Sequence, residues 1–166
     1  MNKLSILFTL FFVLLGLVKV ETKFFTSIRY QQANCTGDVI MAVVMNIEDE
    51  KNPRFNLGVC EEASIVEAVR TPLDALPLRG QYLEVNIRKN CSDIDVTAIQ
   101  YIKIGSCIAN PMDQLLLQIT LENQYYNIKK YHDKACTNVA FTERKELGKC
   151  LTELHDITTY SSIVNK

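Results

Sequence analysis

The chain has 166 residues, of which 48% are hydrophobic and 22% charged, and its 18 basic and 19 acidic side chains give a net charge of −1. This length suits a single domain, and the composition excludes a disordered or collagen-like chain. Because the chain has no surplus of basic side chains, we expect no nucleic-acid partner.

The N-terminal twenty residues have the pattern of a secretory signal peptide. Lys3 gives a short basic start, and an apolar run follows from Leu4 to Val18. Fifteen residues of helix cover only about 22 Å, less than the ~30 Å hydrocarbon core of a membrane. A basic start before a short apolar run is typical of a signal peptide. We therefore expect residues 1–20 to be a signal peptide and residues 21–166 a single secreted β domain. The alternative is an uncleaved signal anchor.

The mature chain is expected to be mildly acidic and extracellular. Removing residues 1–20 takes away Lys3 and Lys19, which leaves 16 basic against 19 acidic side chains and a net charge of −3. No later stretch reaches the roughly 18 consecutive apolar residues of a membrane span. We expect no membrane span after the signal is cleaved.

Six stretches of alternating or β-branched sequence predict strands. In chain order they are residues 24–30, 38–45, 81–88, 96–104, 115–121 and 125–131. Within 81–88, Leu83, Val85 and Ile87 fall on one face and polar side chains on the other. Short strands separated by turn residues are typical of an antiparallel β-sandwich or β-barrel, so we expect an all-β fold.

Two other segments lack the strand pattern. Residues 61–70 favour a helix, which Pro72 and Pro77 would end. The residues after Thr158 carry no strong signal for a helix or a strand. One helix among many strands leaves the all-β expectation unchanged.

A cysteine motif occurs three times after the signal. Each copy starts with Cys and Ser or Thr, and ends with Leu or Ile, Gly, any residue and Cys. The copies start at Cys35, Cys91 and Cys136 and end at Cys60, Cys107 and Cys150. Three copies that match at both ends indicate a duplicated unit. The alternative is that glycine before cysteine is simply a common turn.

The six cysteines of an exported chain predict a framework of three disulfides. If the units are homologous, the economical pairing lies within each unit. This gives Cys35–Cys60, Cys91–Cys107 and Cys136–Cys150. Short loops closed in this way would each stabilise the fold by roughly 3 kcal/mol. Bridges between units remain the alternative.

Two glycosylation sequons overlap the first two motifs. They are Asn34-Cys35-Thr36 and Asn90-Cys91-Ser92. We expect Asn34 and Asn90 to be glycosylation sites exposed at strand ends. The alternative is that the sequons are unoccupied by-products of the repeat.

The sequence shows no catalytic or metal-binding arrangement. His132-Asp133 and His155-Asp156 are adjacent pairs, and neighbours on a strand point to opposite faces, so we expect surface polar residues. The acidic residues 48–50 lack the spacing of a calcium loop and suit a hairpin tip. No nucleophile elbow, phosphate loop or metal-ligand spacing is found. We expect no enzyme activity, no metal and no cofactor.

Several features together resemble a known family. They are the aromatic strand at 24–30, Cys35-Thr36-Gly37, Tyr131 five residues before Cys136-Thr137, the Leu-Gly-x-Cys endings and the tail with Ser161-Ser162. The chain resembles the small secreted cysteine-rich proteins of social amoebae that include the counting-factor-associated proteins. The resemblance covers most of the mature chain in short motifs. It implies an extracellular protein without a catalytic site, linked to signals that gauge cell number or group size.

We therefore expect a secreted, non-enzymatic binding or signalling protein with an extracellular protein partner, in a complex that regulates cell number or group size. Loops on a stapled β scaffold suit partner recognition. Most of the seven tyrosines are expected to be strand residues at the edge of the core rather than on an exposed recognition face. One alternative is a carrier of lipid or another small ligand, based on the apolar stretches 39–45 and 115–121. The other is a protease inhibitor that uses an exposed loop at 49–54.

Overall fold

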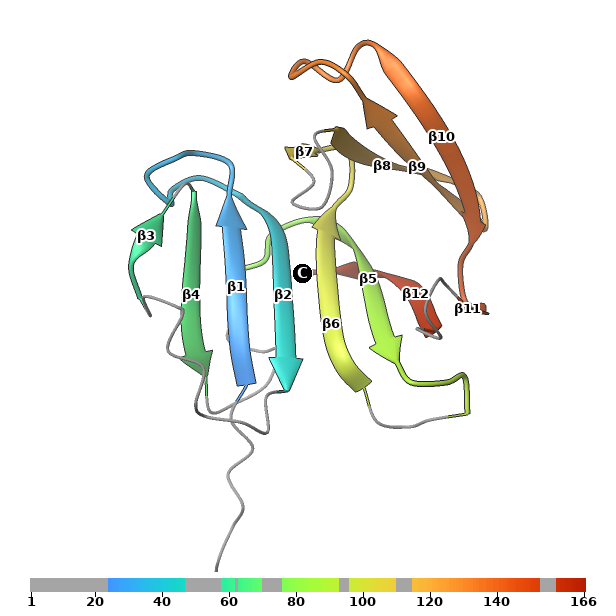
Figure 1. Ribbon diagram of the computed structural model, residues 1–166, viewed down its shortest axis with the longest axis horizontal. Coiled ribbons are helices and arrows are strands. Elements are labelled where there is room, and N and C mark those ends of the chain that lie inside the picture. The colour runs from blue at the N-terminus through green and yellow to red at the C-terminus, as the bar shows by residue number, and fades with distance from the viewer. Residues whose placement is uncertain are drawn as a thin grey trace, which may run out of the picture.

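The computed structural model describes residues 24–46, 58–61, 63–69, 76–92, 96–109, 115–152 and 158–166. In this part of the chain every regular element is a strand (Figure 1). The all-β fold expected from the sequence is confirmed. Four regions that the sequence analysis discussed lie wholly outside the described residues: the predicted signal peptide, the acidic stretch 48–50, the loop 49–54 and the pair His155-Asp156.

Twelve strands are described. They are β1 (Phe24–Tyr30), β2 (Val39–Asn46), β3 (Cys60–Glu61), β4 (Ser64–Val69), β5 (Gln81–Arg88), β6 (Val96–Lys103), β7 (Cys107–Ala109), β8 (Leu116–Glu122), β9 (Tyr125–Tyr131), β10 (Val139–Glu146), β11 (Cys150–Thr152) and β12 (Thr158–Asn165). The six predicted strands correspond to β1, β2, β5, β6, β8 and β9, with bounds that differ by at most one residue. Among the described residues there is no helix long and apolar enough to cross a membrane.

The helix expected at residues 61–70 is wrong, because most of this segment forms β4. This strand pairs antiparallel with β1, from Ser64 opposite Arg29 to Val69 opposite Phe24. Three of its six residues are β-branched and suit a strand. Ladder pairing with β1 therefore outweighs the local helix preference, which tertiary contacts commonly override.

The strands form two antiparallel sheets. The larger sheet has the order β11-β12-β5-β6-β2-β1-β4-β3, and the smaller has the order β10-β9-β8-β7. Figure 1 shows the smaller sheet beside the half of the larger one that contains β6, β5 and β12. Neither sheet closes into a barrel, so of the two expected arrangements the open, sandwich-like one is found.

Opposite faces of the larger sheet bury two apolar clusters. Leu83 and Ile102 pack toward the smaller sheet, against its Ile108, Ile119 and Tyr126. The other cluster contains Ile28, Val39, Ala42, Val44, Leu78, Tyr82 and Tyr101. Tyr82, Tyr101, Tyr126 and Tyr131 are all buried. Four of the seven tyrosines are therefore buried more deeply than the edge of the core, where they were expected.

The three cysteine motifs mark three structural repeats of four strands. Each repeat contains a long hairpin, a short third strand that starts at the second cysteine, and a fourth strand. Repeat one is β1–β4, repeat two is β5–β8 and repeat three is β9–β12. All three hairpins carry a β-bulge at the second residue of their second strand, at Ile40, Thr97 and Ala140. Because the bulge is shared, the repeat extends to the backbone as well as the sequence.

Strand pairing differs among the repeats. In repeat one, β4 pairs with its own β1, but repeats two and three exchange their fourth strands, so β8 pairs with β9 and β12 with β5. This gives three four-stranded units of the same order: β2-β1-β4-β3, β6-β5-β12-β11 and β10-β9-β8-β7. We call these units the first, second and third quartets. Pairing of β2 with β6 joins the first two into the larger sheet.

Candidate functional site

All six cysteines form disulfides, and each bridge lies within one quartet. The pairs are Cys35–Cys60, Cys91–Cys150 and Cys107–Cys136. In every quartet the bridge joins the turn of the hairpin to the start of the short third strand. The three disulfides therefore fix the three hairpin turns in equivalent ways.

The pairing expected within each sequence unit is right for Cys35–Cys60 and wrong for Cys91–Cys107 and Cys136–Cys150. Cys60 follows the end of β2 by 14 residues, whereas Cys107 and Cys150 follow the ends of β6 and β10 by only four. A strand of eight residues extends about 25 Å, and a disulfide needs Cα atoms within about 7 Å. Cys107 and Cys150 therefore stay far from their own hairpin turns and bond to each other's.

Asn34 and Asn90 lie on exposed turns beside bridged cysteines. The Thr36 hydroxyl donates to Asn34 Oδ1 at 2.6 Å, and the Ser92 amide donates to Asn90 Oδ1 at 3.0 Å. A glycan on either asparagine would stand outside the core. Their glycosylation stays a prediction.

The third turn has a carboxylate in place of a sequon. Asp133 accepts hydrogen bonds from the amide and hydroxyl of Thr137 and from the amide of Asn138. These bonds, that from Asn138 above all, hold the pKa of the Asp133 carboxyl below its usual range. Asp133 is thus committed to the turn and does not orient the exposed His132. Across the described ranges, no three His, Cys, Asp or Glu side chains are grouped to hold a metal.

A pocket of about 330 Å³ lies where the β1–β2 turn meets the segment before β5. Its lining residues are Tyr30, Gly37, Asp38, Val39, Pro77 and Arg79, and we call it the turn pocket. Gly37 has a φ of +81°, in the left-handed region that favours glycine. This turn of the backbone brings Asp38 to the start of β2, where it faces β6.

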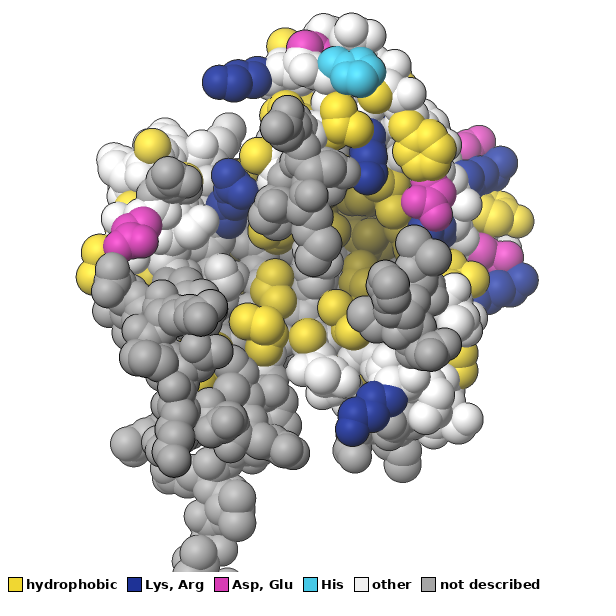
Figure 2. Space-filling view, in the orientation of Figure 1, with side chains coloured by type: hydrophobic (Ala, Val, Ile, Leu, Met, Phe, Trp, Pro, Cys, Tyr) yellow, Lys and Arg dark blue, Asp and Glu magenta, His cyan; other side chains and the backbone are white. Residues whose placement is uncertain are grey.

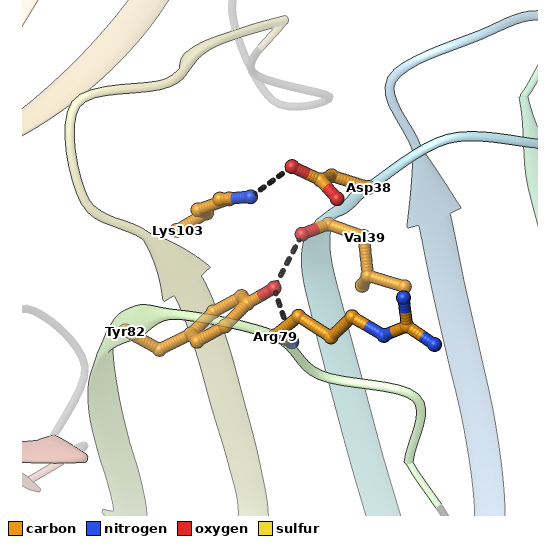
Figure 3. Close-up of polar contacts among 5 residues, drawn as sticks. All are labelled: Asp38, Val39, Arg79, Tyr82 and Lys103. Atoms are coloured by element: carbon orange, nitrogen blue, oxygen red, sulfur yellow. Dashed lines mark hydrogen bonds and ion pairs between the residues drawn. The ribbon is translucent and has the colours of Figure 1, made fainter. Parts of the chain in front are cut away.

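Tyr82 fixes two walls of the turn pocket (Figure 3). Its buried hydroxyl donates to the Val39 carbonyl at 2.7 Å and accepts from the Arg79 amide at 3.4 Å. Burial is the main cause that raises the pKa of the Tyr82 hydroxyl. The hydroxyl therefore stays protonated and keeps both elements in place.

Asp38 pairs with Lys103 across the first and second quartets. The hydrogen bond from Lys103 and its positive charge hold the pKa of the Asp38 carboxyl below its usual range. In Figure 3 this pair lies above the hydroxyl of Tyr82. One carboxylate of the pocket is thus already neutralised from within the fold.

The Arg79 guanidinium adds a positive charge to the turn pocket, and this charge makes a minor contribution to the lowered pKa of Asp38. In Figure 3 the guanidinium extends past the Val39 side chain, and within the described part of the chain no hydrogen bond or ion pair ends on it. Tyr30 and Pro77 add less polar walls. A planar guanidinium beside such walls is suited to a carboxylate, which it can bind through two parallel hydrogen bonds.

Sequence reasoning did not single out Asp38, Arg79, Tyr82 or Lys103 as a site. They come from three separate parts of the chain, and only pairing of β2 with β6 and the return of the chain before β5 bring these parts together. The weak signals were the Gly-Asp pair before β2 and a tyrosine at the start of a strand.

Comparisons with known proteins identify no family. The chain matches no protein-family model, no curated protein and no solved structure. Function is therefore inferred from the residues and geometry of this chain.

Proposed function

We propose that the protein is a secreted, non-enzymatic binding module that holds an extracellular protein partner at the turn pocket. The observation that carries the proposal is the Arg79 guanidinium, which lines the pocket and makes no hydrogen bond or ion pair among the described residues. The partner supplies a carboxylate, either from an acidic side chain or from a chain terminus. Arginine pairs well with such groups because its fork matches their geometry.

The pocket is held in shape before any partner arrives. The Cys35–Cys60 bridge fixes the β1–β2 turn, and Tyr82 ties that turn to the segment before β5. The backbone of Gly80 exchanges two hydrogen bonds with Lys166, at 2.9 and 3.0 Å, which anchors the same segment to the C-terminal end. Preorganisation of this kind lowers the entropy cost of binding.

The proposed extracellular location and the proposed role in regulating cell number or group size are supported by other observations. Three disulfides in a chain of this size are typical of extracellular proteins, and the N-terminal sequence has the pattern of a signal peptide. The resemblance to the cysteine-rich proteins of social amoebae supports a place in a complex that regulates cell number or group size. In this proposal Asn34 and Asn90 carry glycans.

A small-ligand carrier is the second candidate. Figure 2 shows hydrophobic side chains gathered over the middle of the viewed face, while basic and acidic side chains are spread around its rim. Native mass spectrometry of the secreted protein tests this candidate, because a bare protein mass would argue against it. The inhibitor alternative depended on residues 49–54, which lie outside the described residues.

Substitution of Arg79 tests the binding proposal. Protein carrying Arg79→Ala is compared with wild type and with Lys134→Ala, which removes an exposed cation from the third turn. Partners are crosslinked in the medium of the producing cells, identified, and titrated as purified proteins. Loss of a charge-assisted bidentate contact should weaken binding by about tenfold or more, while Lys134→Ala should bind as wild type. Equal binding by the Arg79 variant would remove the turn pocket from the proposal.

Secretion and glycosylation need a separate measurement. Intact mass spectrometry of protein from the medium, before and after deglycosylation, is expected to show a chain without residues 1–20. Asn34→Gln and Asn90→Gln should each remove one glycan mass. Absence of the protein from the medium would contradict the compartment, and an unchanged mass on deglycosylation would contradict the glycans.

A further inference from the structure

Strand β10 is an open edge in a molecule that otherwise pairs its long hairpin strands. It stands at the end of the smaller sheet, and in Figure 1 no described strand lies along its outer side. Its counterparts in the other two repeats, β2 and β6, pair with each other. Among the described strands, the third quartet is therefore the one whose hairpin has no neighbour on the outer side of its second strand.

The pairing of β2 with β6 is two-fold symmetric in terms of the repeat. Its register is Met41↔Ile102, Ala42↔Tyr101, Val43↔Gln100, Val44↔Ile99 and Met45↔Ala98. We number each second strand from the residue after its bulge. Met41 and Ala98 are then both at position one, and Val43 and Gln100 are both at position three. Position three thus pairs with position three, and position one with position five. Such a pairing can equally join two identical strands.

We propose that two copies of the chain associate through β10 in this same register. Position one of β10 is Phe141, so position three, at the two-fold axis, is Glu143. The two third quartets would then form an eight-stranded sheet of order β7-β8-β9-β10-β10-β9-β8-β7. This is the order that the first two quartets already adopt within one chain.

The backbone of β10 offers the required hydrogen-bonding groups. The Leu147 amide bonds to the Gln124 carbonyl, so by alternation the odd-numbered residues 141–145 form the ladder with β9. The N–H and C=O groups of Thr142 and Arg144 consequently point to the open edge. They occupy positions two and four, which pair with each other across the axis.

The same positions join β6 to β2 within the chain. The Ile104 amide bonds to the Gln81 carbonyl, so alternation places the ladder bonds of β6 with β5 on its even-numbered residues. Ile99 and Tyr101 therefore turn their backbone groups to β2. Positions two and four of β6 thus already make the bonds proposed for β10.

The side chains of β10 suit this pairing with a second copy. Phe141 is 52% exposed, which is unusual for a large apolar side chain, and would lie opposite Lys145 of the second copy. There it would pack beside the part of the Lys145 side chain that is still exposed, 14% of its surface. Glu143 lies 3.3 Å from Lys145 in its own chain. At the axis Glu143 lies opposite Glu143 of the second copy, an unfavourable pair that the Lys145 of each chain offsets.

Charge changes at Phe141 test the proposal. Phe141→Lys places two lysines opposite each other at both symmetric positions, whereas Phe141→Glu places a carboxylate opposite Lys145. The mature, disulfide-intact protein is studied by sedimentation velocity up to about 100 μM, the upper range for a weak but specific dimer. Val59→Lys is the matched control, because Val59 is 50% exposed and lies outside the third quartet. Circular dichroism checks that each variant is folded.

Wild type and Val59→Lys are expected to form a dimer with the same dissociation constant. Phe141→Lys should dissociate about tenfold more readily than Phe141→Glu, because two cross-strand pairs change from attraction to repulsion. Hydrogen exchange at the Thr142 and Arg144 amides should slow as wild-type concentration rises. A monomer at all concentrations would overturn the proposal, as would equal effects of the two Phe141 variants. Hydrogen exchange at these amides that does not depend on protein concentration would overturn it too. So would the finding that a different protein binds along β10.

Discussion

Repeat one and the other two repeats carry the same cysteine motif and close it differently. Repeat one keeps its fourth strand and its disulfide within its own residues, whereas repeats two and three exchange both. The quartets have the same strand order in all three cases. The duplicated feature is therefore the quartet, and the length of the connections decides which repeat supplies each strand.

Two connections account for the difference. β8 and β9 are separated only by Asn123 and Gln124, and strands joined by so short a turn form a hairpin. This assigns β8 to the quartet of β9 and leaves β12 for β5. Between β4 and β5 lie 11 residues, so β4 is not forced onto β5 and pairs with β1 instead.

The largest predicted effect is on stability, and it distinguishes the disulfides exchanged between repeats two and three from disulfides within each sequence unit. Cys91→Ser with Cys150→Ser removes one bridge, which closes a 59-residue separation, and should cost about 4 kcal/mol of unfolding free energy. Cys91→Ser with Cys107→Ser removes two bridges and should cost roughly 8 kcal/mol, enough to prevent secretion of a domain of ordinary stability. Secretion yield and urea unfolding measure both variants.

Peptide mapping under non-reducing conditions is the control for this comparison. It should recover Cys91 joined to Cys150 and Cys107 joined to Cys136. If the variant lacking Cys91 and Cys107 were the more stable of the two, the exchange of strands would be wrong.

The second prediction compares the buried tyrosines of the two cores. Tyr82→Phe leaves the Val39 carbonyl without its hydroxyl donor and should cost about 2 kcal/mol. Tyr126→Phe removes a 3.1 Å contact with the Ser161 hydroxyl, and it should cost about 1 kcal/mol because Ser161 can reorient its own hydroxyl. Urea unfolding measures both, and a greater loss for Tyr126→Phe would contradict the central role of Tyr82.

The third prediction concerns strain in repeat one. Ala63 has a φ of 68° and is held there by hydrogen bonds from its amide to Ala33 and from the Tyr30 amide to its carbonyl. Glycine tolerates this conformation, so Ala63→Gly should stabilise the protein by about 0.5–1 kcal/mol. Ala135→Gly, at a position without a positive φ, should give no gain. Thermal unfolding compares the two, and equal shifts would show that Ala63 is unstrained.

The smallest predicted effect compares the carboxylates of the first and third turns. The folded pKa values of Asp38 and Asp133 are both lowered from 3.8. Each carboxylate therefore contributes stability that is present above about pH 4 and is lost as the pH falls through its lowered folded value. Asp38→Asn and Asp133→Asn should each unfold at a lower temperature than wild type at pH 6. Near pH 2 this difference in unfolding temperature should become small.

Salt should distinguish the two carboxylates. Lys103 is the main cause at Asp38, so high salt should reduce the effect of Asp38→Asn. Backbone and side-chain hydrogen bonds dominate at Asp133, and the effect of Asp133→Asn should persist. Thermal unfolding at low and high salt measures this, and equal salt dependence would contradict the assignment.

The strands that sequence reasoning found are those with a strong local pattern. Residues 81–88 alternate clearly because Leu83, Val85 and Ile87 share one face of β5, although the other face also buries Tyr82 and Asn86. β10 was missed because its first four residues are exposed and its last four are charged. β12 was missed because its ladder pairing with β5, rather than apolar alternation, specifies it.

The turn pocket could not be predicted in the same way. Asp38 and Lys103 are 65 residues apart, and neither belongs to a motif with known chemistry. Tyr82 gains its role because its hydroxyl is buried against Val39. Arg79 gains its role because the segment before β5 runs back to the β1–β2 turn. A pattern read along the sequence carries no information on such contacts.

Local patterns and spacing were sufficient for the all-β class, six strands, the three repeats and the participation of all six cysteines in disulfides. These features depend on side-chain alternation and on the repetition of short motifs, which are properties of neighbouring residues. Which cysteines pair, which repeat supplies each fourth strand and where the turn pocket lies depended on the folded chain. Each of these is set by the distance that a connection can span and by competition among strands for the same edge, so none exists before the sheets assemble.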